Sequence, residues 1–154
     1  MLFRSGLTER GEQAAEVLRS AAAKGLHAED YSVPNNAVPP AQAELTLTRS
    51  LMQIAHDLRW GRRNHGLYEQ KPGPDSDLLR QLVADPDGIA AGLSKLEPRF
   101  AEYKRLEAAL PRYQLSGTAD QVNEIELTLE RWRDRKSTRL NSSHIPLSRM
   151  PSSA

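Results

Sequence analysis

The sequence predicts an all-α protein, and three observations support that prediction. Ala and Leu supply most of the apolar residues, as helices prefer, whereas aromatic residues make up only 5%. Apolar residues recur at helical steps of three and four in several segments. No segment alternates apolar and polar residues in the manner of a strand. We therefore expect a small, bundle-like arrangement of several helices.

The first predicted helix covers residues 9–24. Thr8 is its expected N-cap, because a threonine hydroxyl can accept a hydrogen bond from an amide of the first turn. Gly25 stands where a left-handed C-cap residue is needed. The apolar face of this helix is predicted at Ala14, Val17, Leu18 and Ala21.

A second helix is predicted after a short turn and a loop. Residues 27–31 fit a single helical turn, and residues 32–38 contain the Pro and Asn residues typical of a loop. Pro39 and Pro40 then open what we expect to be the longest helix, since proline is tolerated in the first turn. Its narrow buried stripe is predicted at Leu47, Leu51, Ile54 and Leu58.

Two short helices are predicted in the middle of the chain. Gly61 is expected to end the preceding helix, and residues 62–74 form a polar connector rich in Gly and Pro. The first short helix covers residues 77–84. The second covers residues 86–96, with Asp85 as its expected N-cap.

The last two predicted helices carry the remaining apolar positions. Pro98 begins the first, and Pro111 should kink or end it near Leu110. Residues 116–118 interrupt the pattern, and residues 119–133 form a last amphipathic helix. The expected core positions are Phe100, Tyr103, Leu106, Leu110 and Tyr113 in the first helix, and Val122, Ile125, Leu129 and Trp132 in the second.

Residues 134–154 differ abruptly in composition from the rest of the chain. They show no helical or strand periodicity, which is typical of a disordered polar tail. A more specific interpretation comes from reverse translation. In one reading frame, a common short-read sequencing adapter encodes residues 134–144 in order and, after a short barcode, residues 148–154. We therefore interpret residues 134–154 as a disordered, adapter-derived tail.

Charge and composition limit the classes of function. The chain has 21 basic and 20 acidic residues, and residues 134–154 hold four of the basic and one of the acidic residues. The first 133 residues therefore carry 17 basic and 19 acidic residues, which gives a net charge of −2. The basic excess that would suggest a nucleic-acid partner disappears, and we expect none. The chain has no cysteine, which excludes disulfides and a thiolate nucleophile. No apolar run approaches the ~20 residues of a membrane span.

Two groups of residues could be mistaken for functional sites. His56, Asp57 and His65 could be drawn as a metal or catalytic cluster, but a helical and a connector histidine lack the one-face i, i+4 geometry of metal sites. A solvated helix end is the simpler expectation. Trp60 beside basic residues resembles a nucleic-acid patch, although two other settings are commoner: an arginine stacked on Trp60, or Trp60 closing the helix against the core. These basic residues are Arg59, Arg62 and Arg63. We predict no catalytic, cofactor-binding or metal-binding residue.

Seven short motifs follow one another along residues 5–133. They are GLTERG (6–11), KGLHAEDY (24–31), LTRSL (47–51), DLRWGR (57–62), LEPRFAEYKRL (96–106), ALPRY (109–113) and IELTLERWR (125–133). As an ordered set they resemble the scaffold domain of the larger periplasmic L,D-transpeptidases, and the last motif carries the resemblance most strongly.

The resemblance implies a domain division. Residues 1–114 would be the scaffold-like helical domain, and residues 115–133 the connector helix that leads to a catalytic domain missing from this chain. Leu129 and Trp132 should then be more exposed than is usual for their type. The family's small peptidoglycan-binding domain is also absent, since only residues 115–118 separate Tyr113 from the last helix.

The resemblance also implies a role. L,D-transpeptidases use a cysteine thiolate to attack a tetrapeptide stem of peptidoglycan, release D-alanine and transfer the acyl group to a neighbouring stem amine. Without a cysteine this chain is expected to be an inactive fragment, not an enzyme. Its implied partners are the parent's catalytic domain and peptidoglycan, and its implied location is the periplasm, although no secretory signal is present. The alternative is a stand-alone helical adaptor whose amphipathic helices bind partner helices.

Overall fold

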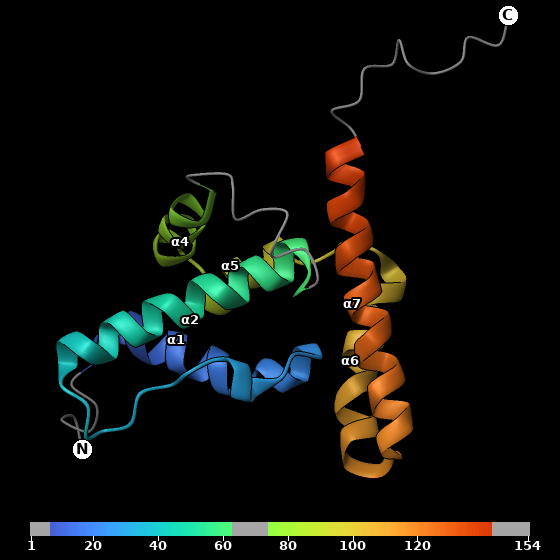
Figure 1. Ribbon diagram of the computed structural model, residues 1–154, viewed down its shortest axis with the longest axis horizontal. Helices are drawn as coiled ribbons and strands as arrows, with labels where there is room; N and C mark the ends of the chain where they lie inside the picture. The colour runs from blue at the N-terminus through green and yellow to red at the C-terminus, as the bar shows by residue number, and fades with distance from the viewer. Residues whose placement is uncertain (1–6, 63–73, 143–154) are drawn as a thin grey trace, which may run out of the picture.

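The protein is all-α over the residues that the structure describes, as predicted. The structure is a computed structural model and describes residues 7–62 and 74–142 (Figure 1). Within these ranges there is no strand and no helix long and apolar enough to cross a membrane. The elements are α1 (Glu9–Arg19), η1 (Ala21–Lys24), η2 (Ala28–Asp30), α2 (Pro40–Trp60), α4 (Pro74–Ala84), α5 (Ile89–Leu96), α6 (Ala101–Ser116) and α7 (Ala119–Ser142).

The first helix is shorter than predicted. The Thr8 hydroxyl accepts a hydrogen bond from the Gly11 amide at 3.1 Å, which confirms the N-cap. The α-helix ends at Arg19 instead of residue 24, and the 3-10 turn η1 follows it. The Ser20 hydroxyl donates to the Val17 carbonyl at 3.0 Å, and such local side-chain bonds compete with the regular helix. The four predicted apolar positions of residues 9–24 are buried.

The second helix lies where it was predicted, but it is not the longest helix of the protein. The turn η2 and the loop after it lie where they were expected, and α2 begins at Pro40 and ends before Gly61. The predicted stripe is buried, from Leu47 to Leu58. However, α2 has 21 residues whereas α7 has 24, so α2 is not the longest helix. Most of the predicted 62–74 connector lies outside the described residues.

The short helices differ from their predicted starts. α4 begins at Pro74, three residues before the predicted start. α5 begins at Ile89, so the predicted start at residue 86 with an Asp85 N-cap is wrong. Asp85 instead organises a turn, because its Oδ1 accepts from the Asp87 amide at 2.9 Å and its carbonyl accepts from the Gly88 amide at 3.2 Å.

The predicted end of the next helix at Pro111 is wrong as well. α6 continues through Pro111 to Ser116. Because Pro111 is exposed, the hydrogen bond that it cannot donate is missing on the solvent side, where water can replace it. Tyr113, predicted in the core, is 39% exposed, since the last buried position of α6 is Leu110.

The last helix extends beyond the predicted boundary. α7 continues from residue 133 to Ser142, so residues 134–142 are helical and the prediction of disorder is wrong for them. Adding residues to an existing helix avoids the cost of nucleation, which explains how a segment without amphipathic periodicity can extend it. Residues 143–154 lie outside the described residues. The adapter origin of this segment stays a prediction.

Two apolar cores divide the molecule. The larger one joins α1, η1, α2, α4 and α5, which we call the helical body. The smaller one lies within the antiparallel pair α6 and α7, which we call the hairpin and which stands across the end of α2 in Figure 1. Leu129 is fully buried there, against the prediction of exposure, and the half-buried Trp132 packs on Phe100 at 5.0 Å between ring centroids.

Candidate functional site

Two glycines lie where α7 contacts the helical body. Gly25 and Gly61 have φ angles of 71° and 84°, a conformation that residues with side chains rarely adopt. A Cβ atom at Gly25 would lie 2.8 Å from Leu129 Cδ1, and one at Gly61 would lie 2.0 Å from Asp134 Oδ1. Both positions therefore need glycine for backbone conformation and for the close approach of α7.

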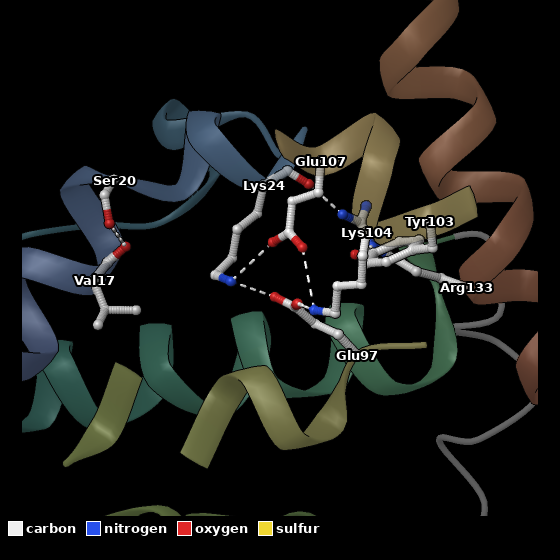
Figure 2. Close-up of polar contacts among 8 residues, drawn as sticks. All are labelled: Val17, Ser20, Lys24, Glu97, Tyr103, Lys104, Glu107 and Arg133. Carbon is white, nitrogen blue, oxygen red and sulfur yellow. Dashed lines mark hydrogen bonds and ion pairs between the residues drawn. The ribbon is translucent and has the colours of Figure 1, made fainter. Parts of the chain in front are cut away.

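A cluster of paired charges joins the hairpin to the body, and we call it the junction (Figure 2). Glu97, between α5 and α6, has a fully buried side chain that accepts from Lys24 of η1 and from Lys104 of α6, the latter at 2.6 Å. Glu107 accepts from the same two ammonium groups at 3.2 Å each. Two lysines and two glutamates from three segments thus neutralise one another.

Arg133 of α7 completes the junction. Its side chain is fully buried, and its Nε donates to the Tyr103 hydroxyl at 3.1 Å. One terminal nitrogen donates to the Lys24 carbonyl, and the other lies 3.4 Å from a carboxylate oxygen of Glu130. The guanidinium also lies over the Tyr103 ring, 5.6 Å from its centroid. Arg133 therefore contacts η1, α6 and its own helix, as Figure 2 shows in part.

The junction sets the ionisation of its members. Burial raises the pKa of Glu107, but the ammonium groups of Lys24 and Lys104 outweigh burial and hold that pKa below its usual value. Burial lowers the pKa of Lys104, and the carboxylates of Glu97 and Glu107 more than reverse that change. Burial also raises the pKa of Tyr103, so its hydroxyl stays protonated. Glu107 is therefore ionised and Lys104 protonated at neutral pH.

An acid-rich cavity of about 550 Å³ lies beside the junction, between α2, α7 and the two 3-10 turns. Its lining contains four carboxylates and only one guanidinium, that of Arg62. The carboxylates belong to Asp30, Asp57, Glu126 and Glu130.

Each of these carboxylates has a partner. Arg62 binds Asp30 through its guanidinium and Glu130 through its backbone amide, each at 2.5 Å. The Tyr31 hydroxyl donates to Asp57 at 2.7 Å. Burial and the adjacent Asp57 charge both raise the pKa of Tyr31. The remaining carboxylate, Glu126, lies 3.9 Å from His27 Nε2.

This cavity supplies hydrogen-bond acceptors rather than a preorganised reactive group. Its lining residues bind one another, and they connect η2 and the end of α2 to α7. Among the residues described, no set of three His, Cys, Asp or Glu side chains is placed to hold a metal ion. Like the junction, this arrangement can fix the direction of α7.

The possible metal or catalytic cluster of His56, Asp57 and His65 was expected to be a solvated helix end. His56 and Asp57 are buried, at 8% and 1% exposure, so the expectation of a solvated helix end is wrong for them. The imidazole Nδ1 lies 3.7 Å from Asp57 Oδ1. α7 packs on α2, and Asp57 lies beside it in the wall of the acid-rich cavity. The third member, His65, lies outside the described residues.

Trp60 is found in one of its two expected settings. The Arg59 guanidinium lies over the indole, 4.9 Å from the ring centroid, which confirms a stacked arginine. The indole itself is half-buried at the end of α2. Of the neighbouring basic residues, Arg62 binds Asp30 across the acid-rich cavity, and Arg63 lies outside the described residues.

Sequence reasoning missed the junction. A signal for Arg133 was present, because it lies four residues after Leu129 and so continues the inward stripe of α7. Glu97 stands between Leu96 and Pro98, which is a weak sign that a carboxylate is buried. Lys24 gives no sign, since a lysine before a C-cap glycine is usual at a helix end.

The sequence was compared with known proteins. A family model described as a scaffold domain matches residues 2–110, which is more than two thirds of the 154 residues. The match therefore includes the whole helical body and the part of α6 that forms the junction. No curated protein matches the sequence. No solved structure matches it either.

Proposed function

The chain belongs to the scaffold-domain family, and on that premise we propose that it is the helical scaffold of an L,D-transpeptidase that cross-links peptidoglycan in the periplasm. In this role it performs no chemistry itself. It holds the helix that leads into the catalytic domain of the parent enzyme at a fixed angle, and the parent's catalytic domain and the peptidoglycan strands are its partners.

The observation that carries this proposal is the anchoring of α7. Arg133 is fully buried and hydrogen-bonded to η1, α6 and α7, so α7 cannot rotate without breaking directional, charge-assisted bonds. Up to Arg133, α7 runs antiparallel to α6, and Arg133 ties its last turns to the junction. A stiff, anchored helix of this kind can set the position of whatever is attached to it.

The choice of an L,D-transpeptidase rests on where the resembling motifs fall. Three of the seven motifs hold the junction: residues 24–31 include Lys24, residues 96–106 include Glu97, and residues 125–133 end in Arg133. Residues 24–31 also include Gly25, which admits Leu129 of the last motif. Three of the segments that resemble the transpeptidase scaffold thus contribute side chains that hold α7 on the body.

A transpeptidase assay on tetrapeptide-containing muropeptides tests this proposal. The chain alone should be inactive, and a fusion to a matching catalytic domain after α7 should be active. Arg133→Ala should lower the activity of the fusion, because α7 loses its anchor, whereas Arg131→Ala on the exposed side of the same turn should not. Activity of the chain alone would overturn the proposal.

A second candidate is a stand-alone helical adaptor, favoured by one observation. The tip of the hairpin exposes two large apolar side chains, Leu115 at 90% and Tyr113 at 39%. Such residues are typical anchors for a partner helix. The sequence of the gene discriminates the two candidates: a reading frame that continues into a cysteine-bearing domain supports the scaffold, and a stop codon near residue 133 supports the adaptor.

A further inference from the structure

We infer that a basic cleft on the helical body binds the terminal carboxylate of a short peptide whose last residue is small and apolar. The cleft has a volume of about 540 Å³ and lies where the end of α2 meets the segment between α5 and α6. Its lining residues are Arg59, Lys95, Leu96, Glu97, Pro98, Arg99 and Phe100. This volume falls within the ~300–1,000 Å³ of small-ligand sites.

The cleft carries a net positive charge when the residues already held in ion pairs are not counted. Glu97 is the only carboxylate in its lining, and Lys24 and Lys104 pair with it. Lys95 is held by Asp85 at 2.7 Å. No carboxylate of the described residues pairs with Arg59 or Arg99, so two guanidinium groups are left to attract an anion.

The two arginines suit a carboxylate better than a diffuse anion. Arg59 is held over the Trp60 ring, so its planar fork loses little freedom when it binds. Arg99 is exposed and directly precedes Phe100 in the cleft. A guanidinium can donate two parallel hydrogen bonds to the two oxygens of one carboxylate, which gives orientation as well as attraction.

The rest of the lining indicates what is attached to the carboxylate. Leu96, Pro98 and Phe100 form an apolar part of the wall beside the arginines. In the last residue of a peptide, the carboxylate and the side chain are bonded to the same carbon atom. A terminal alanine or valine can therefore reach the guanidinium groups and the apolar wall together, whereas an internal Asp or Glu presents its carboxylate without an adjacent apolar group.

This inference goes beyond the scaffold role and does not depend on it. Glu97 belongs to both the cleft and the junction, but the peptide is inferred to bind Arg59 and Arg99, whereas α7 is anchored by Arg133. A failure of either proposal leaves the other intact, because one is measured by peptide binding and the other by the activity of a fusion.

Tryptophan fluorescence of the full chain can test binding directly. The chain has two tryptophans, and both lie next to cleft residues: Trp60 under Arg59, and Trp132 against Phe100. Titration with N-acetyl-alanyl-alanine should give a saturable change. The same peptide with a terminal amide, N-acetyl-glutamate amide and inorganic phosphate should each bind at least about tenfold more weakly, since each lacks the terminal carboxylate beside an apolar side chain.

Variants assign the binding to the cleft. Arg99→Gln should weaken the peptide about tenfold or more, because a charge-assisted pair is lost at an exposed residue that the fold does not need. Arg59→Lys keeps the charge but loses the fork, and should weaken it by less. Arg112→Gln, exposed on α6 outside the cleft, is the matched control and should leave affinity unchanged.

Three results would overturn the inference. They are the absence of a saturable change with the free carboxylate, equal affinity for the terminal amide, and unchanged affinity in Arg99→Gln. Equal or tighter binding of phosphate or of the glutamate side chain would reduce the cleft to a general anion patch and would overturn it too.

Discussion

The helical body and the hairpin are held together by different forces. The body encloses an apolar core to which five elements contribute, so its stability comes from removing apolar surface from water. Among the side chains of the hairpin that the structure describes, only three apolar ones are fully buried, and charged hydrogen bonds attach the hairpin to the body. Apolar burial has little directionality, whereas charge-assisted bonds fix an angle. The charged bonds at the junction therefore serve mainly to fix the orientation of the hairpin on the body, and less to add to the free energy of folding.

The largest effect is expected from breaking the junction at Arg133. Arg133→Ala leaves the buried Tyr103 hydroxyl and the Lys24 carbonyl without their donor, and each buried group left unsatisfied costs about 1–3 kcal/mol of unfolding free energy. Urea denaturation of variant and wild type measures this cost. Arg131→Ala, two residues away and exposed, should change stability by less than about 0.5 kcal/mol. Equal losses in the two variants would contradict a special role for the junction.

A matched pair of leucines distinguishes the two cores. Leu93 in the body and Leu129 in the hairpin are both fully buried, and truncation of either to alanine should cost about 2–5 kcal/mol locally. Leu93→Ala should lower the melting temperature of the whole chain. Leu129→Ala should instead loosen α6 and α7 first. In a Trp60→Phe background, where Trp132 is the remaining tryptophan, the unfolding transition followed by fluorescence should then come before the one followed by far-ultraviolet circular dichroism. Coincident transitions in both variants would mean that body and hairpin form one cooperative unit.

Gly25→Ala is expected to act on the contact between the two regions. The new methyl group would force a left-handed backbone conformation on alanine and would lie 2.8 Å from Leu129 Cδ1. We expect a loss of about 1–3 kcal/mol, measured by urea denaturation. Gly11→Ala within α1, where φ is negative, serves as the control and should be much milder. A neutral Gly25→Ala would show that α7 does not pack where the structure places it.

The smallest expected effect is a pH dependence from Glu107. Its pKa in the folded protein lies below the ordinary value of 4.5, so its stabilising effect is complete above about pH 4.5 and is lost as the pH falls through the lower folded value. Glu107→Gln should therefore be less stable than wild type at pH 7, and the difference should shrink in acid. Glu102→Gln on the exposed face of α6 is the control. A difference that stays constant with pH would contradict this account.

The fold could be predicted from sequence to the extent that local rules decided it. The N-cap at Thr8, the glycine at position 25 and the stripe of α2 follow from capping chemistry and periodicity, and the structure confirms them. The predicted helix boundaries were wrong where a polar side chain formed a local hydrogen bond with the backbone. Ser20 bonds back to its own helix, Asp85 organises a turn, and neither effect is visible in a pattern of apolar residues.

The candidate site was the less predictable part. The junction joins Lys24, Glu97 and Arg133 across 109 residues of sequence, and only the packing of the hairpin on the body brings them together. Charged residues are usually solvated, so a sequence pattern favours the exposed interpretation for each of them. The burial of Leu129 has the same origin, because the body supplies through Gly25 part of the contact that was expected from a missing domain.

Native-state hydrogen exchange on Glu97→Gln tests the central claim, that buried charges at the junction fix the hairpin on the body. The substitution keeps the shape of the side chain but removes the charge that binds Lys24 and Lys104. The account predicts that amides of α6 and α7 lose protection while those of α1, α2 and α5 keep theirs. Unchanged protection in α6 and α7, or an equal loss in all five helices, would contradict it.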